Sequence, residues 1–231
     1  KGEIVNCDSL QIYAGFDIGT AKTPPVERAN IQHHLFDVLQ PHQVYSAGEY
    51  SRDARNILRA ICSRGHLPVV VGGTGFYLRA LLSGLPPLPQ RDTNLRARLL
   101  LRETRRPGSW HRLLSRLEPA AAGRIHANDV QKVTRALEIR LLTKNALPAS
   151  AVAPPLAGFR VIKIGLTPDR AALNARLDAR VEDMFRCGLL DEVGGLMAAD
   201  ASGAEKPFES LGYKQALRHL RGAMTVHEAI A

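Results

Sequence analysis

The feature that most constrains the fold is an alternation of strand and helix in the first 85 residues. Residues 2–8 begin with a β-branched apolar pair and end in polar residues, which predicts a buried strand. Ser46 and Glu49 form a capping box that predicts the start of a helix. A short apolar strand at 67–71 and a helix at 76–82 follow. This order is typical of a parallel sheet, so we predict an α/β fold.

The composition is that of an ordinary globular protein. Hydrophobic residues make up 45% of the chain and charged residues 23%, which excludes wholesale disorder. No apolar run approaches the ~18 residues of a membrane span. The cysteines, Cys7, Cys62 and Cys187, are far apart and predict neither a disulfide framework nor a metal motif. We therefore expect a cytoplasmic protein without a membrane partner.

Most of the net positive charge lies in one quarter of the chain. The whole chain has a net charge of +9, and residues 91–144 hold 13 Lys and Arg against 5 Asp and Glu, a net charge of +8. Such asymmetry is typical of proteins that bind a polyanion, either nucleic acid or an anionic membrane surface. A solvated, arginine-rich helical face is the alternative. Of these, we favour nucleic acid.

The basic stretch has almost no strand pattern and predicts several helices. Asn128 and Asp129 can cap the clearest of them. The apolar residues that we expect on its buried side are Val130, Val133, Leu137 and Leu141. Farther on, residues 160–166 have the composition of a strand, and a helix is predicted from Thr167 onward.

Proline-rich stretches at 86–89 and 146–158 flank the basic helices and predict linkers. An all-helical domain is therefore expected to be inserted into the α/β core. The predicted segments are the first part of the core at 1–90, the helical basic insertion at 91–158, and the returning core with C-terminal helices at 159–231.

Two segments sit where an α/β sheet binds ligands. Asp8 follows the first strand, and its carboxylate suits a general base or a metal ligand, or alternatively a cap of the next turn. The glycine-rich run 72–75 follows the second strand and precedes a helix. It suits anion binding or a plain tight turn. It is not a phosphate-binding P-loop, because no Lys-Ser/Thr pair follows it.

Two further groups have weaker signals. His33 and His34 are adjacent and lack a third histidine or cysteine at ligand spacing, so we do not expect them to bind a metal. The run 131–135 carries Gln131, Lys132 and Arg135, which suits either a phosphate grip or a solvated helix face.

Taken together, eight segments resemble, in order and along essentially the whole chain, those of the tRNA dimethylallyltransferases, the tRNA isopentenyltransferase family. They are EIVNCDSLQIY at 3–13, DIGTAK at 17–22, HHL at 33–35, YSA at 45–47, VVGGTGFY at 70–77, RIH-x-ND at 124–129, QKVTRALE at 131–138 and LGYKQ at 211–215.

The resemblance implies a P-loop NTPase-like parallel sheet with an inserted helical tRNA-binding domain. It also implies transfer of a dimethylallyl group from dimethylallyl diphosphate to N6 of adenosine 37, next to the tRNA anticodon. Mg²⁺ is the implied cofactor, the tRNA anticodon stem-loop the implied partner, and a monomer the expected state.

The resemblance further implies roles for particular residues. Asp8 matches the general base, and Thr74 matches a residue that lines the reaction channel; both are also expected at the tRNA. The other positions that match tRNA contacts are Ser9, Leu10, Gln11, Arg96, Gln131, Lys132, Val133, Thr134 and Arg135. Lys132 stands where the family usually has arginine, so a planar bidentate fork is replaced by a point charge.

In that family the P-loop lies just upstream of the position that matches Lys1. We therefore expect these 231 residues to be a fragment that lacks its cofactor-binding loop and a C-terminal tail, and to be inactive alone. Two alternatives stay open. One is an adenylate isopentenyltransferase that acts on free nucleotides, against which the basic insertion argues. The other is a tRNA-binding fragment without catalysis.

Overall fold

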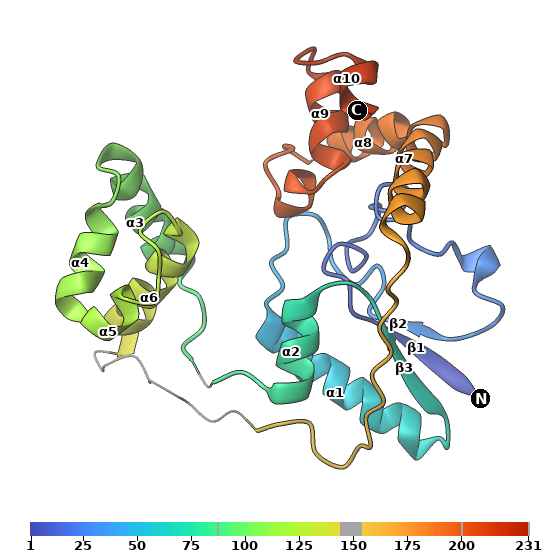
Figure 1. Cartoon of the computed structure of the whole chain (residues 1–231), viewed down its shortest axis with the longest axis horizontal. Coiled ribbons are helices and arrows are strands. Elements are labelled where there is room, and N and C mark those ends of the chain that lie inside the picture. Colours follow the sequence, from blue (N-terminus) through green and yellow to red (C-terminus); the bar gives the residue numbers. More distant parts are fainter. Residues whose placement is uncertain (87, 144–153, 200, 231) are drawn as a thin grey trace. The chain divides into compact units, whose positions relative to one another are not determined.

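The computed structural model describes residues 1–86, 88–143, 154–199 and 201–230. The chain divides into two compact units. The first, here called the core unit, consists of residues 1–84 and 155–231, and the second, the helical unit, consists of residues 85–154 (Figure 1).

A three-stranded parallel sheet lies in the core unit. Strand β1 (Gly2–Asn6) is in the middle, between β2 (His33–His34) and β3 (Leu67–Val71), as Figure 1 shows. The strands predicted at 2–8 and 67–71 are confirmed, whereas no strand was predicted at β2. Because all three strands run the same way, their carboxyl ends share one edge of the sheet, where ligands bind in such folds.

Helix α1 (Ala47–Ser63) connects β2 to β3. Its predicted capping box is present: the Ser46 hydroxyl accepts from the Glu49 backbone, and the Glu49 carboxylate accepts from the Ser46 backbone. The helix packs against the sheet and against α2 (Gly75–Ser83). Its buried residues are Ala47, Tyr50, Ser51, Ala54, Leu58 and Ile61.

The later part of the core unit is helical. Its α-helices are α7 (Arg170–Arg186), α8 (Leu189–Ala198), α9 (Tyr213–Leu220) and α10 (Val226–Ile230), and short 3-10 helices lie at Pro25–Glu27 and Lys206–Glu209. Phe16, from the loop after β1, meets Phe208 edge-on and lies 4.8 Å from the ring of Tyr213. This aromatic cluster fixes the loop after β1 against α8 and α9.

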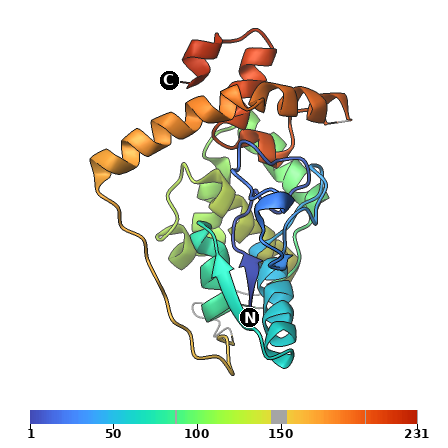
Figure 2. The ribbon, with the colours of Figure 1, turned by 90° about the vertical axis from the view of Figure 1, so that its right-hand side faces the viewer.

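The strand predicted at 160–166 does not form. The chain runs there without secondary structure before α7, as the extended trace in Figure 2 shows. Ile164 and Leu166 are 85% and 91% exposed. A strand needs a neighbour for its backbone N–H and C=O groups, and the described residues supply none to this segment, so β-branched composition did not suffice.

The helical unit is built from α3 (Thr93–Arg105), α4 (Ser109–Leu117), α5 (Pro119–Ala122) and α6 (Val130–Thr143). Its small core is formed by Leu99, Trp110, Leu114, Ala122, Val133, Ala136 and Leu137. Leu141 was expected on the buried side of α6 but is 44% exposed, because this core ends one turn earlier. In the described ranges, no helix has the length and apolarity needed to cross a bilayer.

Candidate active site

The three strands deliver three loops to one edge of the sheet. Asp8 follows β1, residues 35–37 follow β2, and residues 72–74 follow β3. Backbone hydrogen bonds tie the first and third loops, from Cys7 N to the Val71 carbonyl (2.7 Å) and from Thr74 N to the Cys7 carbonyl (3.1 Å). The first and second are tied by Asn6, whose side-chain amide donates to the Leu35 carbonyl at 2.8 Å.

Asp8 is half-buried at the centre of this edge. Its backbone N–H donates to Asn6 Oδ1 at 2.8 Å, and its own Oδ1 accepts from Leu10 N (2.8 Å) and Gln11 N (3.3 Å). Within the described residues, Oδ2 has no hydrogen bond. Asp8 is therefore a turn cap through one oxygen and is available for proton transfer through the other.

Thr74 lies against the same loop. Its Oγ1 accepts from Ser9 N at 2.9 Å and lies 3.3 Å from Ser9 Oγ, whereas it makes no cap bond to α2. Gln11 turns its side-chain amide to the carbonyls of Thr20 (3.0 Å) and Ala21 (3.4 Å). The structure thus brings together Asp8, Ser9 and Thr74 and holds Gln11 beside them.

The first residue of the glycine-rich run, Gly72, must be glycine because the backbone of the Asp8 loop packs closely against it. A Cβ on Gly72 would lie 2.3 Å from the carbonyl carbon of Cys7 and 2.8 Å from the backbone nitrogen of Asp8, and φ is +154°. Any side chain there would push the Asp8 loop away from β3. A Cβ on Gly73 or Gly75 would meet nothing within 4 Å, so the turn opens beyond this contact.

Below the site the surroundings are apolar. Tyr50 of α1 stacks on Tyr77 of α2, with ring centroids 4.3 Å apart. Burial raises the pKa of both phenols far above the ordinary value, and burial likewise raises the pKa of the Cys7 thiol. These three groups are therefore neutral at pH 7.

The second set of expected site residues lies on α6 in the helical unit. Gln131 and Lys132 are exposed, and Lys132 Nζ lies 2.6 Å from Asp129 Oδ2. Val133 and Thr134 are buried, Thr134 completely. The helix therefore presents only part of the predicted tRNA-binding run to solvent. Val133 packs into the core of the helical unit and so anchors the part of α6 that carries the exposed Gln131 and Lys132.

Arg96 and Arg135 converge on a carboxylate that sequence reasoning did not single out. Glu138 is fully buried; its Oε2 lies 3.2 Å from Arg96 and 2.7 Å from Arg135, and its Oε1 accepts from Asp92 N. Arg135 also donates to the Pro89 carbonyl at 2.7 Å. The three-residue spacing from Arg135 to Glu138 on a helix is the signal that could have found the pair.

The described residues do not form a metal site by themselves. They contain no group of three or more His, Cys, Asp or Glu that could hold an ion. His33 bonds the Ile31 carbonyl, and His34 bonds Glu3, which also binds Arg64 and His66. Mg²⁺ usually takes one or two carboxylates plus substrate phosphates and water. A site built from protein ligands alone therefore does not fit this part of the chain.

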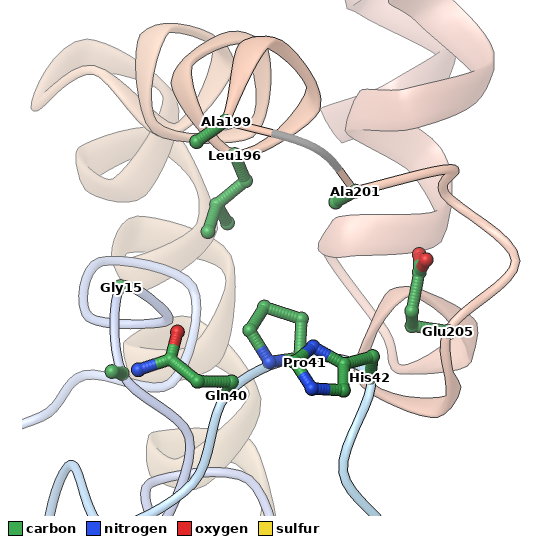
Figure 3. Close-up of a pocket in the computed structure, with 9 residues that line it drawn as sticks. Gly15, Gln40, Pro41, His42, Leu196, Ala199, Ala201 and Glu205 are labelled. Carbon is green, nitrogen blue, oxygen red and sulfur yellow. The ribbon is translucent and has the colours of Figure 1, made fainter.

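A separate pocket of 470 Å³ lies in the core unit (Figure 3). Gln40, Pro41 and His42 face Leu196 of α8 across it, and Glu205 lies at its side. The Glu205 carboxylate already accepts from the backbones of Ser202 and Gly203. None of Asp8, Ser9 and Thr74 lines it, so this pocket is distinct from the edge of the sheet.

Comparison with known proteins gives consistent results. Residues 11–231 match the sequence profile of the family described as IPP transferase. The chain is 56% identical over 233 residues to a tRNA dimethylallyltransferase from Solibacter usitatus, covering 99% of this chain and 75% of the relative. It is 48% identical to a tRNA dimethylallyltransferase from Koribacter versatilis, covering 100% and 76%.

Solved structures show the same likeness. The full-length tRNA isopentenylpyrophosphate transferase from Bacillus halodurans superposes with a TM-score of 0.67 at 34% identity, covering 99% of this chain and 72% of that one. A eukaryotic dimethylallyltransferase acting on tRNA superposes with a TM-score of 0.81 at 27% identity, covering 99% and 59%. The predicted fold class, a P-loop NTPase-like α/β core with a helical insertion, is confirmed.

Proposed function

The chain belongs to the IPP transferase family, and from this premise we propose that it is a tRNA dimethylallyltransferase, an enzyme that modifies tRNA by prenyl transfer. The observation that supports the chemistry most directly is the arrangement of Asp8. One carboxylate oxygen is fixed by two backbone N–H groups, and the other has no hydrogen bond in the described part of the chain.

The proposed acceptor is N6 of adenosine 37 and the proposed donor is dimethylallyl diphosphate. In the reaction, a bond forms between N6 and C1 of the allyl group while the bond from C1 to the diphosphate oxygen breaks. The diphosphate leaves with the electron pair, and Asp8 Oδ2 accepts the N6 proton. General-base assistance of this kind typically contributes 10²–10⁴-fold in rate.

The target base must leave its stack before N6 can reach a carboxylate, at a cost of about a few kcal/mol. The loop 9–11 lies next to Asp8 and is fixed by Thr74 and by the carbonyls of Thr20 and Ala21. We propose that this loop receives the extruded base. A preformed loop needs no further ordering when the base arrives, which favours catalysis.

The helical unit is the proposed grip on the anticodon stem-loop. Its net charge of +8 across residues 91–144 suits the phosphate backbone, which dominates nucleic-acid affinity. Mg²⁺ bound together with the donor diphosphate, a monomeric state and a cytoplasmic location also stay predictions. No step above passes through a metal ion.

The test is transfer of a labelled dimethylallyl group from its diphosphate by the full-length protein. We expect label on N6 of adenosine 37 in a tRNA with an intact anticodon stem-loop, and none on free AMP. Equal labelling of AMP would favour the adenylate isopentenyltransferase alternative. Specific tRNA binding without any transfer would indicate a protein that binds tRNA without modifying it, and would contradict the proposed activity.

A further inference from the structure

The run DIGTAK at 17–22 supplies the Thr20 and Ala21 carbonyls that hold Gln11, and its last residue has an unusual environment. The Lys22 side chain is only 3% exposed. Its ammonium nitrogen donates to the Tyr13 carbonyl at 2.7 Å, to Asp17 Oδ1 at 2.6 Å and to Asp37 Oδ1 at 2.6 Å. A lysine has three donors, and all three are occupied here. Lys22 therefore has no donor left for a substrate.

The three acceptors belong to three different segments. Tyr13 lies in the loop that begins at Asp8, Asp17 lies in the run itself, and Asp37 lies in the loop after β2. Burying a lysine is costly unless charged partners and hydrogen bonds compensate it. The two carboxylates and one carbonyl provide both, so this ammonium acts as a fixed junction of the three segments.

The junction reaches Asp8 from both sides. On one side, the carbonyls of Thr20 and Ala21, directly before Lys22, accept from the side-chain amide of Gln11. The backbone N–H of Gln11 in turn donates to Asp8 Oδ1. On the other side, the segment that ends at Asp37 contains Leu35, and the Leu35 carbonyl accepts from Asn6. Asn6 in turn accepts from the Asp8 backbone.

The backbone around the junction is strained. Ala21, Leu35 and Asp37 have φ values of +47°, +62° and +57°, in the left-handed region that residues with a Cβ rarely adopt. Such conformations persist only where surrounding contacts over-determine them. A second clamp acts on the same run, since the Glu192 carboxylate of α8 accepts from Asp17 N, Ile18 N and the Tyr213 hydroxyl.

We propose that Lys22 is a positioning residue for prenyl transfer: its ammonium joins Tyr13, Asp17 and Asp37 and thereby holds the Asp8 carboxylate and the Gln11 side chain in reactive geometry. The proposal rests on the proposed function for its catalytic readout. It assigns Lys22 no contact with tRNA or with the prenyl donor.

The test is Lys22→Met in the full-length protein, which keeps an unbranched side chain only one atom shorter and removes the ammonium donors. A misplacement of about 1 Å can cost about 10²-fold in rate, so we expect kcat to fall by about that factor. KM for tRNA should stay within about threefold, because Lys22 is buried and all three of its donors are used within the protein. Lys206→Met removes an exposed lysine of the core unit and is the matched control, with kcat unchanged.

A second variant separates position from charge balance. Lys22→Met combined with Asp17→Asn and Asp37→Asn removes the carboxylates that the first variant leaves uncompensated, and so protects folding. We expect this triple variant to fold yet stay slow, because Tyr13 still lacks its donor. Recovery of wild-type kcat in the triple variant, or an unchanged kcat in folded Lys22→Met, would overturn the proposal. So would a change confined to KM.

Amide hydrogen exchange provides a readout that does not depend on activity. In Lys22→Met, the amides of residues 10–22 should exchange faster than in the wild type, while those of α1 should not change. Unaltered exchange in residues 10–22 would overturn the proposal even if kcat fell. If the wild-type protein transfers no prenyl group to tRNA, the proposed function fails, whereas the exchange result still decides whether Lys22 holds this loop.

Discussion

At the scale of single residues, the two oxygens of Asp8 have different tasks, and one substitution separates them. Asp8→Asn keeps an oxygen that can accept from Leu10 N and Gln11 N, so the turn should persist. The amide cannot accept a proton at neutral pH. We therefore predict that kcat falls by at least about 10²-fold while tRNA affinity stays nearly constant. Single-turnover rates and equilibrium tRNA binding, measured on the same preparation, check this.

The matched control is Asp191→Asn, which removes an exposed carboxylate at the start of α8 and should leave turnover unchanged. A variant of Asp8 that loses tRNA binding but keeps the turnover rate of each bound complex would show that Asp8 is only a turn cap.

The residues that sequence reasoning found and those it missed differ in the reach of their contacts. Asp8 and Thr74 stand out because each follows an apolar strand. Lys22 and Glu138 do not, because their partners lie up to 15 and 46 residues away along the chain. Only the folded backbone shows that Lys22 meets Asp37, or that Arg96 and Arg135 share one carboxylate.

At the scale of elements, local signals predicted α1 and β3 and failed at 160–166. The start of α1 is encoded by a capping box within four residues, and its buried face by helical periodicity. A strand is encoded only in part by its own residues, since its stability depends on the neighbour that completes its hydrogen bonds. Of the two apolar segments, 67–71 has β1 as such a neighbour, and 160–166 has none among the described residues.

Strand β1 also carries an ionic cluster that makes the stability of the core unit depend on pH. The hydrogen bond from Arg64, with those from His34 and His66, lowers the pKa of Glu3 from 4.5 to about 2. A carboxyl whose pKa is lower in the folded state stabilises the protein above its unfolded pKa. This stabilisation is lost as the pH falls from about 4.5 toward 2. We predict that Glu3→Gln lowers the free energy of unfolding at pH 7 and that the deficit shrinks across this window.

Urea unfolding at pH 7, 5 and 3 measures the difference between Glu3→Gln and the wild type. The control is Glu27→Gln, which neutralises an exposed carboxylate and should change the unfolding free energy little at any of these pH values. A deficit for Glu3→Gln that is as large at pH 3 as at pH 7 would mean that the cluster acts through packing, and would contradict the ionic explanation.

At the scale of the whole molecule, charge is divided between the two units according to their proposed tasks. Residues 91–144 account for +8 of the net charge of +9, so the remainder of the chain is close to neutral. Several cations of the helical unit face carboxylates of the same unit, among them Arg96, Lys132, Arg135 and Arg140. These pairs fix side chains in place, while the excess of arginine leaves the unit strongly positive toward a polyanion.

If that excess binds RNA phosphates, tRNA affinity must depend on salt. The logarithm of the binding constant should fall linearly with the logarithm of salt concentration, by about 0.7–0.9 for each phosphate neutralised. Lys132 is the sharpest probe, because its side chain is 72% exposed and its ammonium pairs with Asp129 at the surface. We predict that Lys132→Ala flattens the slope by about one unit.

Lys163→Ala removes the same charge from an exposed site in the core unit and should leave the slope unchanged. Filter binding between 50 and 300 mM salt (about a sixfold range) measures both. Equal slopes for the two variants would show that attraction to tRNA depends on net charge alone, and would remove α6 from the proposed interface.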